Sequence, residues 1–123
     1  MSNTTADSAE SDGDGNVGRP SSLADADALD AFVADADAAI VEFYTNGCSL
    51  CDGMKPVLAN VARDLGVDAA LINPRDDAPL VERFDVRSVP LFVLFVDGEP
   101  VARRAEGFVP GEELAAWVEE HAG

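Results

Sequence analysis

The first half of the chain shows two different spacings of apolar residues. Within residues 22–36 they recur every three or four positions with aspartates between them, which predicts an amphipathic helix. Ser22 and Asp25 look like a capping pair at its start. The following run, AAIVEFY at residues 38–44, is apolar throughout apart from Glu42. Such a run is typical of a strand that is buried on both faces.

The same two spacings continue through the middle of the chain. Residues 48–66 return to helical spacing, with Pro56 inside the predicted helix and a glycine at its end. VDAALIN at residues 67–73 predicts a second buried strand. A short helix is expected within residues 76–84.

The last third of the chain predicts a hairpin followed by a helix. Residues 91–96 are entirely apolar, and the Asp-Gly pair at 97–98 is a strong signal for a tight turn. The return strand is expected at residues 100–105. After Gly107 a last amphipathic helix is predicted.

Strands that alternate with helices predict an α/β fold with a partly parallel sheet, to which the hairpin adds an antiparallel edge. We therefore expect a small mixed sheet with helices on both faces. Residues 1–21 contain almost nothing to bury and predict a disordered acidic tail. Residues 22–123 predict one domain, and no strand is evident before Ser22.

The charge of the chain restricts its partners. The 123 residues include 8 basic and 24 acidic ones, which gives a formal net charge of −16. Nucleic acids and anionic membranes both require a basic footprint, so neither is expected as a partner. The acidity favours a surface adapted to salt, as in salt-loving archaea.

The remaining features concern location and assembly. No apolar stretch reaches the roughly 18 residues of a membrane span. The first residues lack the basic start and apolar stretch of a secretory signal. We expect a cytoplasmic monomer, in a compartment where structural disulfides are uncommon.

The only two cysteines of the chain, Cys48 and Cys51, lie three residues apart at the start of a predicted helix. A zinc site takes three or four protein ligands, whereas this chain offers two cysteines and His121, so a metal would require two subunits. A purely structural disulfide is also a weak explanation, because so short a loop restrains little of the unfolded chain. Redox chemistry fits best, since residues at this spacing lie within about 5–6 Å of each other on a helix.

The position of Cys48 favours the role of nucleophile. At a helix N-terminus, unpaired N–H groups and the helix dipole stabilise a thiolate. That thiolate attacks a disulfide of another protein, and Cys51 then resolves the mixed disulfide.

Several motifs together resemble the thioredoxin family. VEFYTNGCSLC at 41–51 is similar to its strand and CxxC segment, and Pro56 matches its helix-kinking proline. SVPLFVLFVDGEPV at 88–101 resembles its cis-proline, strand and turn, and EGF at 106–108 its glycine before the last helix. The resemblance implies a thioredoxin fold and a dithiol–disulfide oxidoreductase that needs no cofactor. It also implies disulfide-containing client proteins and an upstream thioredoxin reductase as partners.

The resemblance also assigns roles around the cysteines. Glu42 matches the family's buried acid, which exchanges protons with the resolving thiol, and burial is expected to raise its pKa. Pro90 matches the cis-proline that faces the thiols, and the carbonyl and amide of Val89 pair with a substrate backbone. Gly47 and Gly107 complete the expected substrate-binding set.

The residues at the active-site turn depart from the family pattern. Gly47 replaces the usual tryptophan, and Ser-Leu replaces Gly-Pro between the cysteines. Residues between the cysteines tune the reduction potential, so this protein is expected to differ from general thioredoxins in reducing strength. A glutaredoxin-like protein that uses glutathione and a binding adaptor without redox activity remain as alternatives.

Overall fold

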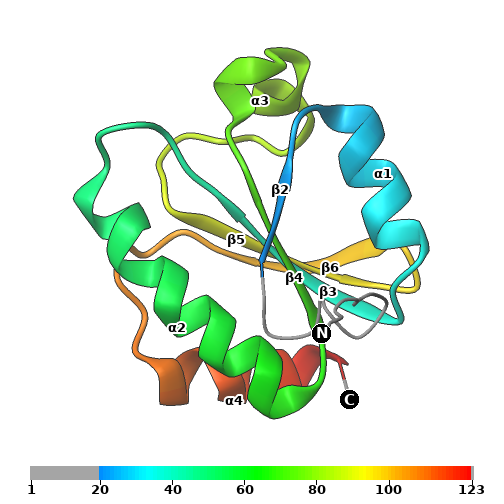
Figure 1. Ribbon diagram of the computed structural model, residues 1–123, viewed down its shortest axis with the longest axis vertical. Helices are drawn as coiled ribbons and strands as arrows, with labels where there is room; N and C mark the ends of the chain where they lie inside the picture. Colours follow the sequence, from blue (N-terminus) through cyan, green and yellow to red (C-terminus); the bar gives the residue numbers. More distant parts are fainter. Residues whose placement is uncertain (1–19, 123) are drawn as a thin grey trace, which may run out of the picture.

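A mixed five-stranded sheet, in the order β2-β4-β3-β5-β6, lies at the centre of the protein (Figure 1). The computed structural model describes residues 20–122. The strands are β2 (Ser21–Leu23), β3 (Ala38–Phe43), β4 (Asp68–Ile72), β5 (Leu91–Val96) and β6 (Glu99–Arg104). The first three run parallel to one another, whereas β5 is antiparallel to β3 and β6 is antiparallel to β5. The predicted mixed sheet is therefore confirmed.

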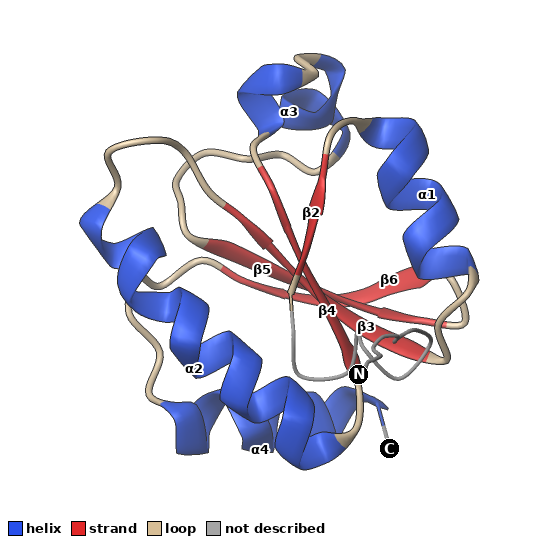
Figure 2. Cartoon of the chain, viewed as in Figure 1, coloured by secondary structure: helices blue, strands red, loops and turns tan. Residues whose placement is uncertain are grey.

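Helices cover both faces of this sheet, as the sequence predicts (Figure 2). They are α1 (Ala26–Ala34), α2 (Ser49–Leu65), α3 (Pro79–Arg83) and α4 (Gly111–Ala122), with a 3₁₀ turn, η2 (Pro74–Asp76). Buried residues of α1 and α3 form one core cluster with the sheet, and those of α2 and α4 form the other. None of the helices within residues 20–122 is long and apolar enough to cross a membrane.

The alternation of side chains along β3 decides which face each residue occupies. Val41 and Phe43 belong to the core beneath α1 and α3, while Ile40 belongs to the core beneath α2 and α4. Successive side chains of a strand point to opposite faces. Glu42 therefore lies on the same face as Ile40, beneath α2.

The beginning of the domain differs from the sequence prediction. Ser22 does not cap the first helix but lies within β2, whose residues pair with β4. Asp25 is the N-cap, and its carboxylate accepts a hydrogen bond of 2.9 Å from the Ala28 amide. The strand was missed because it has three residues and only one of them, Leu23, is a large apolar residue. Of the expected acidic tail, residues 1–19 lie outside the described part of the chain.

The predicted turns are confirmed by the backbone. Asp97 and Gly98 both have positive φ, 54° and 82°, as a tight two-residue hairpin turn requires. Helix α2 ends at Gly66, which adopts the left-handed conformation with φ 69°. The final helix begins at Gly111, four residues after Gly107.

Candidate active site

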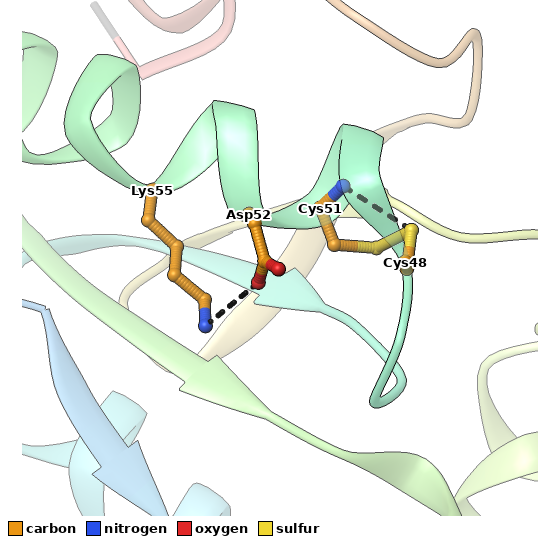
Figure 3. The surroundings of a disulfide bond; sticks show 4 residues. All are labelled: Cys48, Cys51, Asp52 and Lys55. Atoms are coloured by element: carbon orange, nitrogen blue, oxygen red, sulfur yellow. Dashed lines mark hydrogen bonds and ion pairs between the residues drawn. A yellow bond between two sulfur atoms is a disulfide. The ribbon is translucent and has the colours of Figure 1, made fainter.

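Cys48 and Cys51 are joined by a disulfide at the start of α2 (Figure 3). Their Cα atoms are 5.3 Å apart, within the range that a disulfide spans. Cys48 is the N-cap of the helix, and its Sγ accepts a hydrogen bond of 3.2 Å from the Cys51 amide. Gly47 precedes it with φ 80°, a conformation that favours glycine. The chain thus turns sharply from β3 into the helix.

The two sulfur-bearing residues differ in their access to solvent. Cys48 is partly exposed, whereas Cys51 has no exposed surface. Cys48 is at the N-terminus of α2, a position where unpaired N–H groups and the helix dipole favour a thiolate. This arrangement makes Cys48 the thiol that another protein can reach.

The Val89–Pro90 peptide bond is cis, as the family resemblance implies. Leu91 follows directly as the first residue of β5, where it pairs with Phe43, the last residue of β3. Because these strands are antiparallel, the segment before β5 and the loop after β3 lie at the same end of the sheet. Val89 and Pro90 are thereby brought to the end of the sheet that carries the disulfide.

Glu42 is a fully buried acid. Its side chain has no exposed surface, and within residues 20–122 neither carboxyl oxygen has a hydrogen-bond partner. Its neighbours in the sheet are Leu71 on β4 and Phe92 on β5, both apolar. Loss of hydration raises the pKa of Glu42 to about 8, partly opposed by the charge of Lys55 and reinforced by that of Asp52.

Lys55 and Asp52 form a charged pair on the first turns of α2. The Lys55 Nζ lies 3.2 Å from a carboxylate oxygen of Asp52 (Figure 3). It also lies 4.9 Å from the centre of the Tyr44 ring. The sequence reasoning gave neither charged residue a role. Their i,i+3 spacing was visible in the sequence, but their proximity to a buried acid on another element was not.

Two exposed apolar side chains, one between the cysteines and one next to Gly107, were also missed. Leu50, between the cysteines, is 49% exposed, and Phe108 is 51% exposed. Gly107, the residue before Phe108, lies next to Leu50, because a Cβ built there would be 3.7 Å from Cδ1 of Leu50. With φ 87°, Gly107 also holds a backbone conformation that other residues rarely adopt.

Comparison with known proteins decides the family. The thioredoxin family model matches residues 21–120, which is most of the chain. The chain belongs to the thioredoxin family. This match establishes the thioredoxin fold that the resemblance implied, with the disulfide at the start of α2 as the CxxC pair.

Individual thioredoxins agree with this assignment. The chain is 36% identical over 84 residues to a thioredoxin of Staphylococcus saprophyticus, covering 67% of this chain and 80% of the relative. It is 33% identical over 95 residues to a thioredoxin of Chlamydia pneumoniae, covering 76% and 91%. A solved mutant thioredoxin of Halobacterium salinarum superposes with a TM-score of 0.81 at 27% identity, covering 88% of this chain and 95% of that one.

Family and geometry together give the activity. A thioredoxin with a CxxC pair at disulfide distance is a thiol–disulfide oxidoreductase, and this one is a protein-disulfide reductase. The match to thioredoxins favours this activity over the glutaredoxin-like and adaptor alternatives. Reduction of a client disulfide oxidises the two thiols of this thioredoxin to the disulfide seen in the structure.

The buried acid is expected to lower the stability of this thioredoxin at alkaline pH. The Glu42 carboxyl has a pKa of about 8 in the folded protein, against an ordinary value of 4.5. Between these two pH values the folded protein keeps a proton that the unfolded chain releases. The contribution of Glu42 to the free energy of unfolding is fully present below pH 4.5. It is lost as the pH rises from there through 8. Glutamine does not titrate, so the advantage of Glu42→Gln over wild type should be about 3 kcal/mol larger at pH 8 than at pH 5.5.

Urea unfolding of the oxidised proteins in molar KCl measures this difference. Glu119→Gln, on the exposed surface of α4, controls for the loss of one negative charge. A stability difference for Glu42→Gln that does not change with pH would contradict the assignment of a raised pKa.

Proposed function

We propose that Cys48 is the attacking thiol of this thioredoxin and Cys51 the resolving thiol. The Cys48 thiolate attacks one sulfur of a client disulfide, forms a mixed disulfide and releases the other client sulfur as a thiolate, which takes a proton from water. Cys51, as a thiolate, then attacks Sγ of Cys48. The Cys48–Cys51 disulfide forms, and the second client thiol departs. Two electrons pass to the client, and an upstream reductase returns them.

The observation that carries this assignment is the unequal placement of the two residues. Cys48 caps α2 and is partly exposed, so it is both accessible and stabilised as a thiolate. Cys51 is fully buried one turn further on, where only the mixed disulfide can bring a sulfur to it.

We propose that Glu42 accepts the proton that Cys51 loses before it attacks. Its carboxyl lies beneath the first turns of α2, and both oxygens are free to accept a hydrogen bond. Its pKa of about 8 is close to the ordinary thiol value of about 8.5, so the proton transfer is nearly balanced in energy. An acid with the ordinary glutamate value would be a far weaker base.

Client proteins are proposed to bind across the surface that surrounds Cys48. The backbone of Val89, next to the cis-proline Pro90, offers a carbonyl and an amide to an extended client segment. Gly47 and Gly107 leave the approach to the disulfide free of side chains. Leu50 and Phe108 are exposed beside Gly107 and supply apolar contact.

We further propose that this thioredoxin acts as a monomer in a salt-rich cytoplasm. The support is its composition, with a formal net charge of −16 and a single lysine, and its likeness to a thioredoxin of Halobacterium salinarum. Concentrated ions screen the repulsion among surface carboxylates that would otherwise destabilise the fold.

Trapping experiments test the order of the two cysteines. Cys51→Ser should accumulate a mixed disulfide with a model client such as insulin, because its second step is blocked. Cys48→Ser should form at least about tenfold less adduct, since its remaining thiol is buried. Non-reducing electrophoresis and peptide mapping measure both adducts. Comparable adduct formation by Cys48→Ser would reverse the assignment.

The role of Glu42 predicts a particular pH dependence of turnover. Glu42→Gln should leave capture of the client nearly unchanged but slow turnover about tenfold near pH 7, because Cys51 loses its proton acceptor. The deficit should shrink toward pH 9, where hydroxide deprotonates Cys51 without help. A pH–rate profile of both proteins in an insulin-reduction assay measures this. Parallel profiles of equal rate would remove Glu42 from the chemistry.

The salt adaptation predicts a strong dependence of melting on KCl. Between 0.2 and 2 M KCl the melting temperature should rise by about 5–10 °C, as carboxylate repulsion is screened. A variant lacking residues 1–19 should retain full turnover and the same salt dependence, because β2 begins only at Ser21. Melting that does not change with salt would contradict the proposal, as would loss of activity on truncation.

A further inference from the structure

Asn46 and Gly47 form an Asn-Gly pair in the turn that leads from β3 into α2. The chain contains no other such pair. Asparagine before glycine is especially prone to deamidation, because glycine has no side chain to hinder attack of its backbone nitrogen on the asparagine side chain. The pair directly precedes Cys48, so a chemical change within it falls next to the proposed attacking thiol.

The structure leaves this pair open to reaction. Both residues are exposed and lie in a turn outside the flanking strand and helix. A Cβ built on Gly47 would meet no atom within 4 Å apart from its own chain neighbours. Within residues 20–122 the Gly47 amide donates no hydrogen bond to the backbone, and the Asn46 side chain makes none. Neither packing nor hydrogen bonding therefore restrains the two reacting groups.

The other asparagines within residues 20–122 are protected in ways that Asn46 is not. Asn60 lies inside α2, and its Oδ1 accepts a hydrogen bond of 2.8 Å from the guanidinium group of Arg63. Asn73 is buried and precedes Pro74, which has no backbone N–H to take part in the reaction. The same molecule thus carries one open asparagine and two internal references.

We propose that Asn46 is a site of spontaneous deamidation and that the carboxylate formed there lowers the reactivity of Cys48. The backbone nitrogen of Gly47 bonds to Cγ of Asn46, and the side-chain NH₂ leaves with the proton of that nitrogen as ammonia. Water then opens the resulting cyclic imide at either carbonyl, which gives aspartate or isoaspartate. The reaction consumes water, releases ammonia and requires neither an oxidant nor a reductant.

The consequence for Cys48 follows from the position of the new charge. Both products carry a carboxylate two residues before Cys48, and the Cα atoms of the two residues are at most about 7 Å apart. A like charge at this range disfavours the thiolate. Isoaspartate also adds a main-chain atom before Gly47, in the turn that places Cys48 at the helix N-cap. The effect on client reduction rests on the attacking role proposed for Cys48, whereas the modification itself does not.

Incubation of the folded, oxidised protein at pH 8 in molar KCl tests the modification. Peptide mapping by mass spectrometry follows all three asparagines in one sample. Asn46 should convert to aspartate and isoaspartate, and Asn60 should react at least about tenfold more slowly, because it must first lose a helical hydrogen bond. Asn46→Gln should remain unmodified at this position, since its longer side chain forms the ring far less readily. Conversion of Asn46 as slow as that of Asn60 would overturn the site.

The effect on Cys48 is tested with Asn46→Asp, which reproduces the aspartate product. Alkylation of reduced Cys48 by iodoacetamide at pH 7 should be about threefold slower than in wild type, the change expected for half a pH unit. Asn46→Gln should match wild type. Asn60→Asp adds the same charge further along α2 and serves as the matched control. The lowest KCl concentration that maintains the fold keeps screening small. Equal alkylation of Asn46→Asp and wild type would overturn the effect on Cys48.

A second readout separates this proposal from the attacking role of Cys48. In a Cys51→Ser background, Asn46→Asp should slow capture of insulin by the same factor as alkylation. Slower alkylation with unchanged capture would support the effect of deamidation on Cys48 and would instead overturn Cys48 as the thiol that attacks the client.

Discussion

Burial of the Glu42 carboxyl beneath the first turns of α2 is the constraint on which the rest of the site depends. The strand β3 is covered on both faces, so a polar side chain at this position has no route to water. The fold tolerates it because a protonated carboxyl costs much less to bury than an ionised one. Glu42 therefore holds a proton near neutral pH, which is the basis of its proposed proton exchange with Cys51.

The beginning of α2 serves the chemistry in several ways at once. Its N-cap is Cys48, whose sulfur accepts a hydrogen bond from a helix amide, and its first turn buries Cys51. The next turn presents Asp52 and Lys55, whose charges act on Glu42 in opposite directions. A single helix therefore carries the groups proposed as nucleophile and resolving thiol and covers the proposed proton acceptor.

The sequence was sufficient where a local pattern determines the structure. The apolar run of β5, the Asp97–Gly98 turn and the end of α2 at Gly66 were all predicted, because each depends on residues close in sequence. The short strand β2 was not, since it is stabilised by pairing with β4 about fifty residues away. The approach of Gly107 to Leu50, and of Lys55 to the Tyr44 ring, likewise depends on contacts between elements that spacing alone does not reveal.

Coupling between Glu42 and Cys51 in the reduced protein tests the central claim most directly. With ¹³C labels in both side chains, NMR titration of reduced wild type follows the two groups together. Groups that exchange a proton influence each other, so each label should report two shared transitions. In Glu42→Gln the Cys51 label should show one simple transition at a different pH. A Cys51 titration that is the same in both proteins would contradict proton exchange between the buried acid and the resolving thiol.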